Sequence, residues 1–256
     1  AAFTSTTAVC VTGLVVVDTF SYWSLFGKGV ILILIQIGGL GIVSIITLFM
    51  LLFRMKITLK STMLLQDAFN LNSKQGLLKF TIKVIKGTFL IEGIGAFIYS
   101  FYYCREYGLL KGIWFSVFHA VSAFCNAGLD IMGADSLIPY HSNLLMMLNT
   151  SFLIIMGGIG FIVWWDTVEA FRRIRTKKCS IRSAWNGVHL QTKIAIFMTL
   201  LLLIGGTVVI YFLERSNPDT LGNLSEKDRI LNAFFQSVTL RTAGFAAVPQ
   251  AALRPV

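Results

Sequence analysis

The chain has 256 residues, of which 55% are hydrophobic and only 13% are charged, and its formal net charge is +10. Its mean hydropathy is +0.75. Soluble domains carry roughly 25% charged residues, so this composition excludes an ordinary soluble domain. It predicts an integral membrane protein.

Four apolar stretches are long enough to be membrane-spanning helices, which need about 20 mostly apolar residues. In chain order they cover residues 26–53, 87–103, 144–165 and 194–213. The second stretch carries one charge, Glu92, and is short unless its helix begins closer to Lys79. We therefore expect four spans in an all-α membrane protein.

The positive charges lie mainly in residues 54–86 and 172–193, whereas the alternate loops hold most of the acids. The positive-inside rule places the two basic segments in the cytoplasm and the acidic loops outside. This placement favours a basic membrane face, with membrane lipids as partners, over nucleic-acid binding. Residues 172–178 could face lipid or dock a cytosolic regulator, and the sequence leaves both open.

Residues 111–130, "KGIWFSVFHAVSAFCNAGLD", begin and end on the external side in this topology. They are too apolar for a simple loop and too short to cross the membrane twice. We therefore predict a re-entrant segment, a half-helix followed by irregular backbone that must be buried in protein or line a cavity. Residues 1–14 and 229–245 fit the same description.

The ends of these three segments align with one another. "VTG" at residues 11–13 corresponds to "NAG" at 126–128 and "TAG" at 242–244, and "QIGGLG" at 36–41 recurs as "IMGGIG" at 155–160. Matching motifs that recur after roughly 115 residues indicate an internal repeat of span, half-helix, glycine tip and span.

The repeat predicts the division of the chain. Residues 1–60 are the end of a first unit, with its pore loop and second helix, and residues 61–78 are a cytoplasmic linker. Residues 79–166 form a second unit of helix, pore loop and helix. Residues 167–189 are a basic cytoplasmic linker, and residues 190–256 hold the first helix and pore loop of a third unit.

The glycine tips have the chemistry of a cation filter. A half-helix whose C-terminus points inward places partial negative charge near the membrane centre, and the irregular backbone after it offers carbonyl oxygens that can replace an ion's hydration shell. Glycine permits positive φ and a close approach of several backbones. We therefore predict ion-binding residues at Val11, Thr12, Gly13, Asn126, Ala127, Gly128, Thr242, Ala243 and Gly244. For the glycines of 38–41 and 157–160 we favour helix packing.

Several stretches together resemble the Trk/Ktr/HKT superfamily of potassium transporters, most closely the bacterial Ktr-type pore subunit. They are "TAVCVTGLVVVDT", "FHAVSAFCNAGL", "IQIGGLG", "GGIGF", "SNPDTLG" and "SVTLRTAGF". The resemblance covers the whole chain. It implies repeated helix, pore half-helix, filter loop and helix units around one central potassium pathway, with filter glycines at Gly13, Gly128 and Gly244.

The resemblance also implies a homodimer in the bacterial plasma membrane, with a cytosolic nucleotide-binding regulatory ring on its inner face. Potassium is then the substrate, bound at the filter residues, and sodium stimulates uptake. No covalent cofactor and no transition-metal site are expected. A glycine in every visible filter matches the potassium-selective members of the superfamily.

The chain departs from the family pattern in two ways. Family members have a helix before the opening loop and a fourth unit after the third, so the resemblance predicts a fragment with three of four filter loops. They also usually have Asn after the third Gly-Phe, where this chain has Ala246.

Four polar residues near the predicted filter are candidates for supporting or tuning it. Arg241 should turn away from a cation path, toward acids such as Glu226 or Asp228, and we favour bracing over direct tuning. Glu92 is costly within a membrane and so a functional candidate, but it could equally pair with Lys86 or with a polar group on a neighbouring span.

Asp18 and Asp130 follow filter tips on the outer side and could concentrate cations there or be solvated loop residues. We slightly favour the first. For His119 we favour a hydrogen-bonded structural role over a pH sensor.

Channel-like potassium uptake is therefore the function that the sequence predicts. The alternative is an ion-coupled secondary transporter of another cation or small solute, which would need polar side chains at broken helices, and only Glu92 qualifies. No paired carboxylates, metal-ligand cluster or nucleophile–base set occurs at membrane depth, so we do not expect an enzyme.

Overall fold

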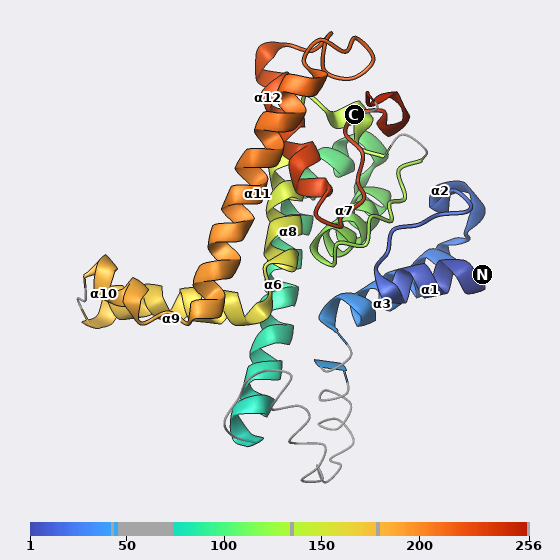
Figure 1. The fold of residues 1–256 in the computed structure, drawn as a ribbon. Coiled ribbons are helices and arrows are strands. Elements are labelled where there is room, and N and C mark those ends of the chain that lie inside the picture. The colour runs from blue at the N-terminus through green and yellow to red at the C-terminus, as the bar shows by residue number, and fades with distance from the viewer. Residues whose placement is uncertain (42–43, 46–73, 134–135, 178–179, 255–256) are drawn as a thin grey trace.

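The computed structural model describes residues 1–41, 44–45, 74–133, 136–177 and 180–254. Within these ranges the regular structure is helical, without strands, which confirms the predicted all-α class (Figure 1). The end of the predicted first span and residues 61–73 of the predicted linker lie outside the described residues. The rest of that linker, from Lys74 on, is already part of a helix.

The helices follow one another in an order that repeats. The elements are α1 (Ala2–Cys10), α2 (Thr19–Tyr22), α3 (Leu25–Leu40), α6 (Lys74–Tyr107), α7 (Leu109–Phe124), η1 (Ile138–Tyr140), α8 (Leu144–Gly158), α9 (Phe161–Lys177), α10 (Ile181–Asn186), α11 (Leu190–Glu214), α12 (Glu226–Thr239) and η2 (Gln250–Ala252). A short helix that ends just before a predicted glycine tip occurs three times, as α1, α7 and α12.

Two of these short helices, α7 and α12, belong to segments that return to the end where they began. At the start of α12, Arg229 Nε donates to Leu221 O (3.1 Å), and after the tip Arg254 N donates to Glu214 Oε1 (3.0 Å) in the same loop region. Beside the start of α7, Glu106 accepts a 2.5 Å hydrogen bond from Tyr140 Oη in η1, beyond the second tip. In these two segments the chain therefore enters and leaves on the same side of the bundle, as the re-entrant prediction requires.

Two described helices are long and apolar enough to cross a membrane, residues 81–107 of α6 and all of α11. Helix α3 is a shorter apolar helix of 16 residues. The helices α8 and α9 would count as a third span only together, and they bend by 101°.

That bend corrects the prediction of one continuous span over residues 144–165. The break falls at Gly160, whose φ of +94° is accessible to glycine at little cost but strained for other residues. The chain therefore turns sideways at Gly160, and α9 runs across the direction of α8 (Figure 1).

The hydrophobic core lies around the second half-helix. Helix α7 contacts α3, α6 and α8, and its second half, from residue 118 to residue 124, is buried on every side. The fully buried aromatic side chains Tyr99, Tyr103, Phe118, Phe235 and Phe245 come from α6, α7 and the third re-entrant segment. Burying aromatic side chains supplies much of the packing area in a core, and here it fixes the ends of the half-helices relative to one another.

Candidate ion-binding site

The three predicted glycine tips lie side by side. A Cβ atom placed on Gly13 would lie 2.9 Å from Ala127 O, and one on Gly128 would lie 2.3 Å from Ala243 O and 3.1 Å from Gly244 Cα. Each neighbouring carbonyl therefore occupies the space that a side chain would need. Residues 11–13, 126–128 and 242–244, far apart in the sequence, form one continuous row; we call them the first, second and third tips.

All three tips share one backbone pattern. The first residue of each has positive φ, +53° at Val11, +57° at Asn126 and +84° at Thr242, and the glycine at the third position has it again, between +63° and +79°. Residues other than glycine rarely adopt this conformation, and it costs them roughly 1–2 kcal/mol. Its recurrence at three matching positions marks a built feature that the surrounding packing maintains.

Hydroxyl groups from the half-helices close each tip. Leu14 N donates to Thr7 Oγ1 (3.1 Å), Ser122 Oγ donates to Leu129 O (2.5 Å), and Thr239 Oγ1 donates to Phe245 O (2.8 Å). The hydroxyl lies six residues before the glycine in the first two tips and five before it in the third. The third tip is therefore closed by a loop that is one residue shorter.

The glycine pairs of the following helices lie directly behind the first two tips. A Cβ on Gly38 would lie 2.2 Å from Val9 O, and one on Gly157 would lie 1.7 Å from Phe124 O. Val9 and Phe124 each stand four residues before the glycine of their tip. These close approaches are what the packing interpretation of the two glycine motifs expects.

The side chain of Asn126 turns away from the row of tips toward α8. With its amide oriented to satisfy both neighbours, Asn126 donates to Ile154 O and accepts from Gly158 N, both at 3.2 Å. In the first tip the side chain of Val11 occupies the matching place against Gly38. In both tips, therefore, the backbone faces the row of tips. The side chains of Val11 and Asn126 point the other way and anchor the tips to the helices behind them.

The C-terminal ends of α1, α7 and α12 all lead into the tips. The unpaired carbonyls of a helix C-terminus carry partial negative charge, about half an elementary charge for each helix. Three such ends beside a row of backbone carbonyls make a site that favours a cation without any acidic side chain.

Glu92 lies behind the second tip, in α6, and is 4% exposed. Its Oε1 accepts a hydrogen bond from Gln36 Nε2 in α3 (3.0 Å) and lies 3.9 Å from Cys125 Sγ, while Oε2 has no partner. Of the two partners predicted for it, the polar group on a neighbouring span is the one observed. The carboxyl group joins α3, α6 and the residue that precedes the second tip.

Arg241 turns away from the row of tips, but not toward the acids that the sequence suggested. Its Nη2 donates to Thr199 Oγ1 in α11 (3.2 Å). Glu226 instead accepts from Arg229, and Asp228 accepts from Ser225. The prediction of an acidic partner was wrong because both acids lie in the first turn of α12, roughly 20 Å along the helix from its other end at 1.5 Å per residue.

The two acids beyond the tips are held by local hydrogen bonds. Burial opposes ionisation of Asp18, but hydrogen bonds from Ser21 and Phe20 outweigh it and lower the pKa of this carboxyl, which caps α2. Burial raises the pKa of Asp130 against hydrogen bonds from Ser136 and Met132, and the charge of Asp18 acts in the same direction as burial. The Asp18 carboxylate therefore lies close enough to Asp130 to oppose ionisation of its carboxyl group.

His119 is buried without a hydrogen bond, which corrects the predicted hydrogen-bonded role. Neither ring nitrogen has a partner. The ring packs against Tyr99, Tyr103 and Phe245, with centroid distances of 4.9, 6.1 and 4.9 Å. It connects the second half-helix to the residue that follows the third tip.

Ala246, where the resemblance predicts Asn, contacts the neighbouring segment through its backbone. Its N–H donates to Ser136 Oγ (3.4 Å), and its carbonyl accepts from Leu137 N (3.0 Å). The chain after the third tip is thereby paired with the chain after the second, in contacts that do not need an Asn side chain.

Several supporting residues were missed by reasoning from the sequence. Gln36, Cys125 and Thr199 act through contacts between distant segments; Gln36 and Cys125 lie in the recurrent stretches, but nothing in those stretches indicates which residue each contacts. The hydroxyls of Thr7 and Ser122 could have been found, because both stand six residues before a tip glycine in the aligned repeats. The structure places the nine predicted filter residues together, whereas Glu92 and Arg241 lie behind the tips.

Comparison with known proteins gives a consistent result. The family model TrkH, described as "Cation transport protein", matches residues 1–256. The potassium/sodium uptake protein NtpJ of Enterococcus hirae is 42% identical over 97% of this chain and 52% of its own length. The Ktr system potassium uptake protein B is 38% identical in Bacillus subtilis, over 99% of this chain and 54% of its own length. In Vibrio alginolyticus it is 35% identical, over 97% and 52%. The chain thus spans about half the length of these curated relatives.

Proposed function

This chain belongs to the TrkH family of cation transport proteins, and from that premise we propose that its three tips form part of a channel-like pathway for potassium uptake. The family and the two spanning helices make it a multi-pass protein of the cell membrane. The named relatives are potassium or potassium/sodium uptake proteins. We extend the potassium part of those names to this chain.

The observation that carries the proposal is the contact between the tips. Ala127 O lies against Gly13 and Ala243 O lies against Gly128, at distances that leave no room for a side chain. A partly dehydrated potassium ion needs several carbonyl oxygens converging from different strands of backbone. In each tip the first and third residues have positive φ, and a row of such tips offers carbonyl oxygens from three segments of backbone. The C-terminal ends of the half-helices add partial negative charge, which attracts a cation.

In this proposal the filter is formed by the backbone of residues 11–13, 126–128 and 242–244. Asp18 and Asp130 raise the local concentration of cations outside. Arg241 and Glu92 hold the third and second tips from behind and do not bind the ion. We further propose sodium stimulation, assembly as a homodimer and control by a cytosolic nucleotide-binding regulatory ring, as the resemblance to the Ktr type implies.

The test is a serine substitution at a tip glycine that has space for it. A Cβ on Gly244 would meet only Gly128 Cα, at 3.4 Å, so Gly244→Ser is limited mainly by its φ of +79°. We expect the preference of uptake for potassium over sodium to fall by about tenfold, the ratio that corresponds to about 1.4 kcal/mol. Ion fluxes would be measured in a bacterium that lacks its own potassium uptake systems.

A matched control separates the role in the filter from backbone strain. Gly108 has nearly the same φ, +80°, and an added Cβ would meet nothing within 4 Å, but it lies at the start of α7 and far along the chain from any tip. Gly108→Ser should retain the wild-type selectivity. Unchanged selectivity in Gly244→Ser at normal expression would overturn the filter assignment, and uptake that requires a second coupled ion would favour the secondary transporter instead.

A further inference from the structure

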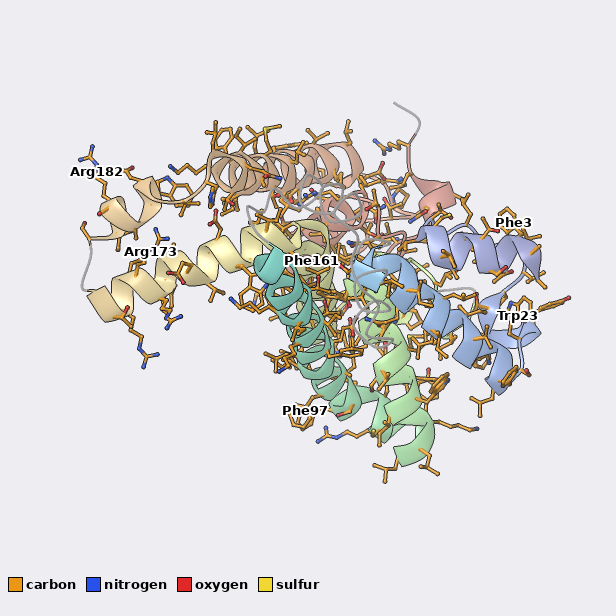
Figure 2. All side chains as sticks on the ribbon, turned by 90° about the horizontal axis from the view of Figure 1, so that it is seen from below. Phe3, Trp23, Phe97, Phe161, Arg173 and Arg182 are labelled. Atoms are coloured by element: carbon orange, nitrogen blue, oxygen red, sulfur yellow. The ribbon has the colours of Figure 1, made fainter. Side chains whose placement is uncertain are left out.

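Helices α9 and α10 form an arm that leaves the bundle sideways. The chain bends by 101° between α8 and α9, and Figure 1 shows α9 and α10 lying across the direction of α11 and projecting away from the other helices. In Figure 2, viewed from below, the arm extends outward from Phe161, with Arg173 along it and Arg182 near its outer end.

The level of the arm is fixed by contacts to the start of α11. Asp166 in α9 accepts hydrogen bonds from His189 N (3.1 Å), His189 Nδ1 (2.8 Å) and Thr192 Oγ1 (2.7 Å). A carboxylate at a helix N-terminus satisfies free N–H groups and interacts favourably with the helix dipole. Because α11 is a 25-residue candidate span that begins at Leu190, the arm lies at the height where this span enters the membrane.

The arm exposes large apolar side chains on both helices. Val168 and Phe171 in α9 are 54% and 67% exposed, and Ile181 and Trp185 in α10 are 75% and 45% exposed. In contrast, Ala184 and Val188 are buried. A surface with phenylalanine, tryptophan and isoleucine uncovered at the level of a membrane boundary has the composition of an interfacial helix.

The charges of the arm are mostly positive. Residues 161–189 hold six Lys or Arg and two Asp or Glu. Both acids are engaged, since Asp166 holds the start of α11 and Glu169 pairs with Arg173 at 3.5 Å. The side chains of Arg172, Arg175 and Arg182 are exposed. The positive-inside rule places this basic segment on the cytoplasmic side, where the leaflet is rich in anionic lipid.

We propose that the arm formed by α9 and α10 lies on the inner surface of the membrane and binds anionic phospholipid headgroups. Phe171, Ile181 and Trp185 enter the boundary between headgroups and acyl chains, and Arg172, Arg175 and Arg182 contact the phosphates. Lateral projection at membrane level together with exposed apolar side chains favours lipid over a soluble regulatory protein. The inference depends on the topology of the membrane segments and not on which ion is carried.

The first experiment locates Trp185 in the purified protein in phosphatidylcholine nanodiscs that contain phosphatidylglycerol. The difference in fluorescence between the wild type and Trp185→Phe isolates this side chain. We expect quenching by phosphatidylcholine brominated near the headgroup and little quenching by aqueous iodide. Trp164 lies in the first turn of α9, where the arm leaves the bundle, and is only 7% exposed, so it is the internal control. The difference in fluorescence between the wild type and Trp164→Phe should respond weakly to both quenchers.

The second experiment removes the charges. In Arg172→Gln/Arg175→Gln/Arg182→Gln we expect the affinity for phosphatidylglycerol, measured by lipid retention in detergent, to fall roughly fivefold for each charge, or about a hundredfold in all. The control Lys111→Gln/Arg215→Gln/Lys227→Gln removes the same number of exposed charges from the external segments and should retain the lipid as the wild type does.

Other outcomes would overturn the inference. Quenching of Trp185 by iodide and not by brominated lipid would place the arm in water, as a docking surface for a soluble protein. Quenching by neither reagent would place it against protein, as in a contact between two copies. Equal retention of phosphatidylglycerol by the two triple variants would show that the arm does not bind the anionic headgroup.

Discussion

The second and third tips have the same backbone pattern but different support. Phe124 and Leu240 both stand four residues before their tip glycine, yet Phe124 is 1% exposed and Leu240 is 68% exposed. Gly157 packs directly on the carbonyl of Phe124, and Glu92 reaches the second tip through Cys125. Behind the third tip, α11 accepts hydrogen bonds from Arg241, at Thr199 Oγ1, and from Ser237, at Leu203 O.

This difference separates what forms a tip from what holds it in place. Positive φ at Asn126 and Gly128 is matched at Thr242 and Gly244, although the neighbours behind them differ. The shape of a tip therefore does not depend on one particular set of neighbours behind it, although packing must maintain the positive φ of its non-glycine residue in each case. The packing behind it determines how much a substitution costs, so equivalent positions in the two tips should respond differently.

The largest difference should come from the helix behind the second tip. An Ala side chain at Gly157 would place Cβ 1.7 Å from Phe124 O, whereas at the adjacent Gly158 the nearest atom is the Asn126 side-chain amide, at 3.4 Å. Gly157→Ala should lower the free energy of unfolding by about 3 kcal/mol or more, because backbone must move. Gly158→Ala should change it little. Thermal unfolding in detergent compares the two, and equal loss in both would contradict this account of the packing.

A smaller difference should separate the two tip glycines themselves. In Gly128→Ala the new Cβ would lie 2.3 Å from Ala243 O at a φ of +63°, whereas in Gly244→Ala it would have ordinary contact distances at a φ of +79°. Strain alone costs roughly 1–2 kcal/mol, and overlap adds about 1–3 kcal/mol for Gly128→Ala only. Thermal unfolding should therefore show Gly128→Ala as the less stable variant, and the reverse order would mean that the tips do not touch as described.

The smallest difference concerns the polar contacts behind the tips. Gln36→Leu removes the 3.0 Å hydrogen bond to Glu92. Because the Glu92 side chain is buried and cannot turn to water, this variant should lose about 1–3 kcal/mol in the free energy of unfolding, measured by thermal unfolding in detergent. Thr199→Val removes the partner of Arg241, whose side chain is only half-buried, and should lower the free energy of unfolding by less, about 1 kcal/mol.

A double substitution tests the cause of this effect. Gln36→Leu/Glu92→Leu removes both polar partners together, so it should recover much of the stability that Gln36→Leu loses in thermal unfolding. No recovery would mean that Gln36 acts by packing and not by hydrogen bonding to Glu92.

The half-helices and tips could be predicted because their signals are local. The length of an apolar stretch, its topology and a recurrent glycine all lie within short windows of sequence, so α1, α7 and α12 were expected near their observed places. The close contact of the three tips also followed, in outline, from the repeat. The bend after α8 was missed because residues 144–165 are uncharged and mostly apolar, and hydropathy does not distinguish a straight helix from one broken at Gly160.

The partners of polar residues could not be predicted for a related reason. Arg241 was expected to pair with an acid of its own half-helix, but the geometry of α12 places Glu226 and Asp228 at the other end. Thr199, which it contacts instead, lies 42 residues earlier in the chain and carries no motif. His119 lacks hydrogen bonds because the surrounding rings fill the space around it, which depends on how α6, α7 and the third segment meet.

The sequence by itself determined the membrane class and the all-α fold, and it predicted where short helices end near a glycine, because hydropathy and the conformational freedom of glycine are properties of single residues and their near neighbours. Only the tertiary structure decided which carbonyl lies against which glycine, what braces each tip and where the basic arm lies. Those features depend on distances between segments that are far apart along the chain, and the closing of the re-entrant loops and the bend at Gly160 set these distances.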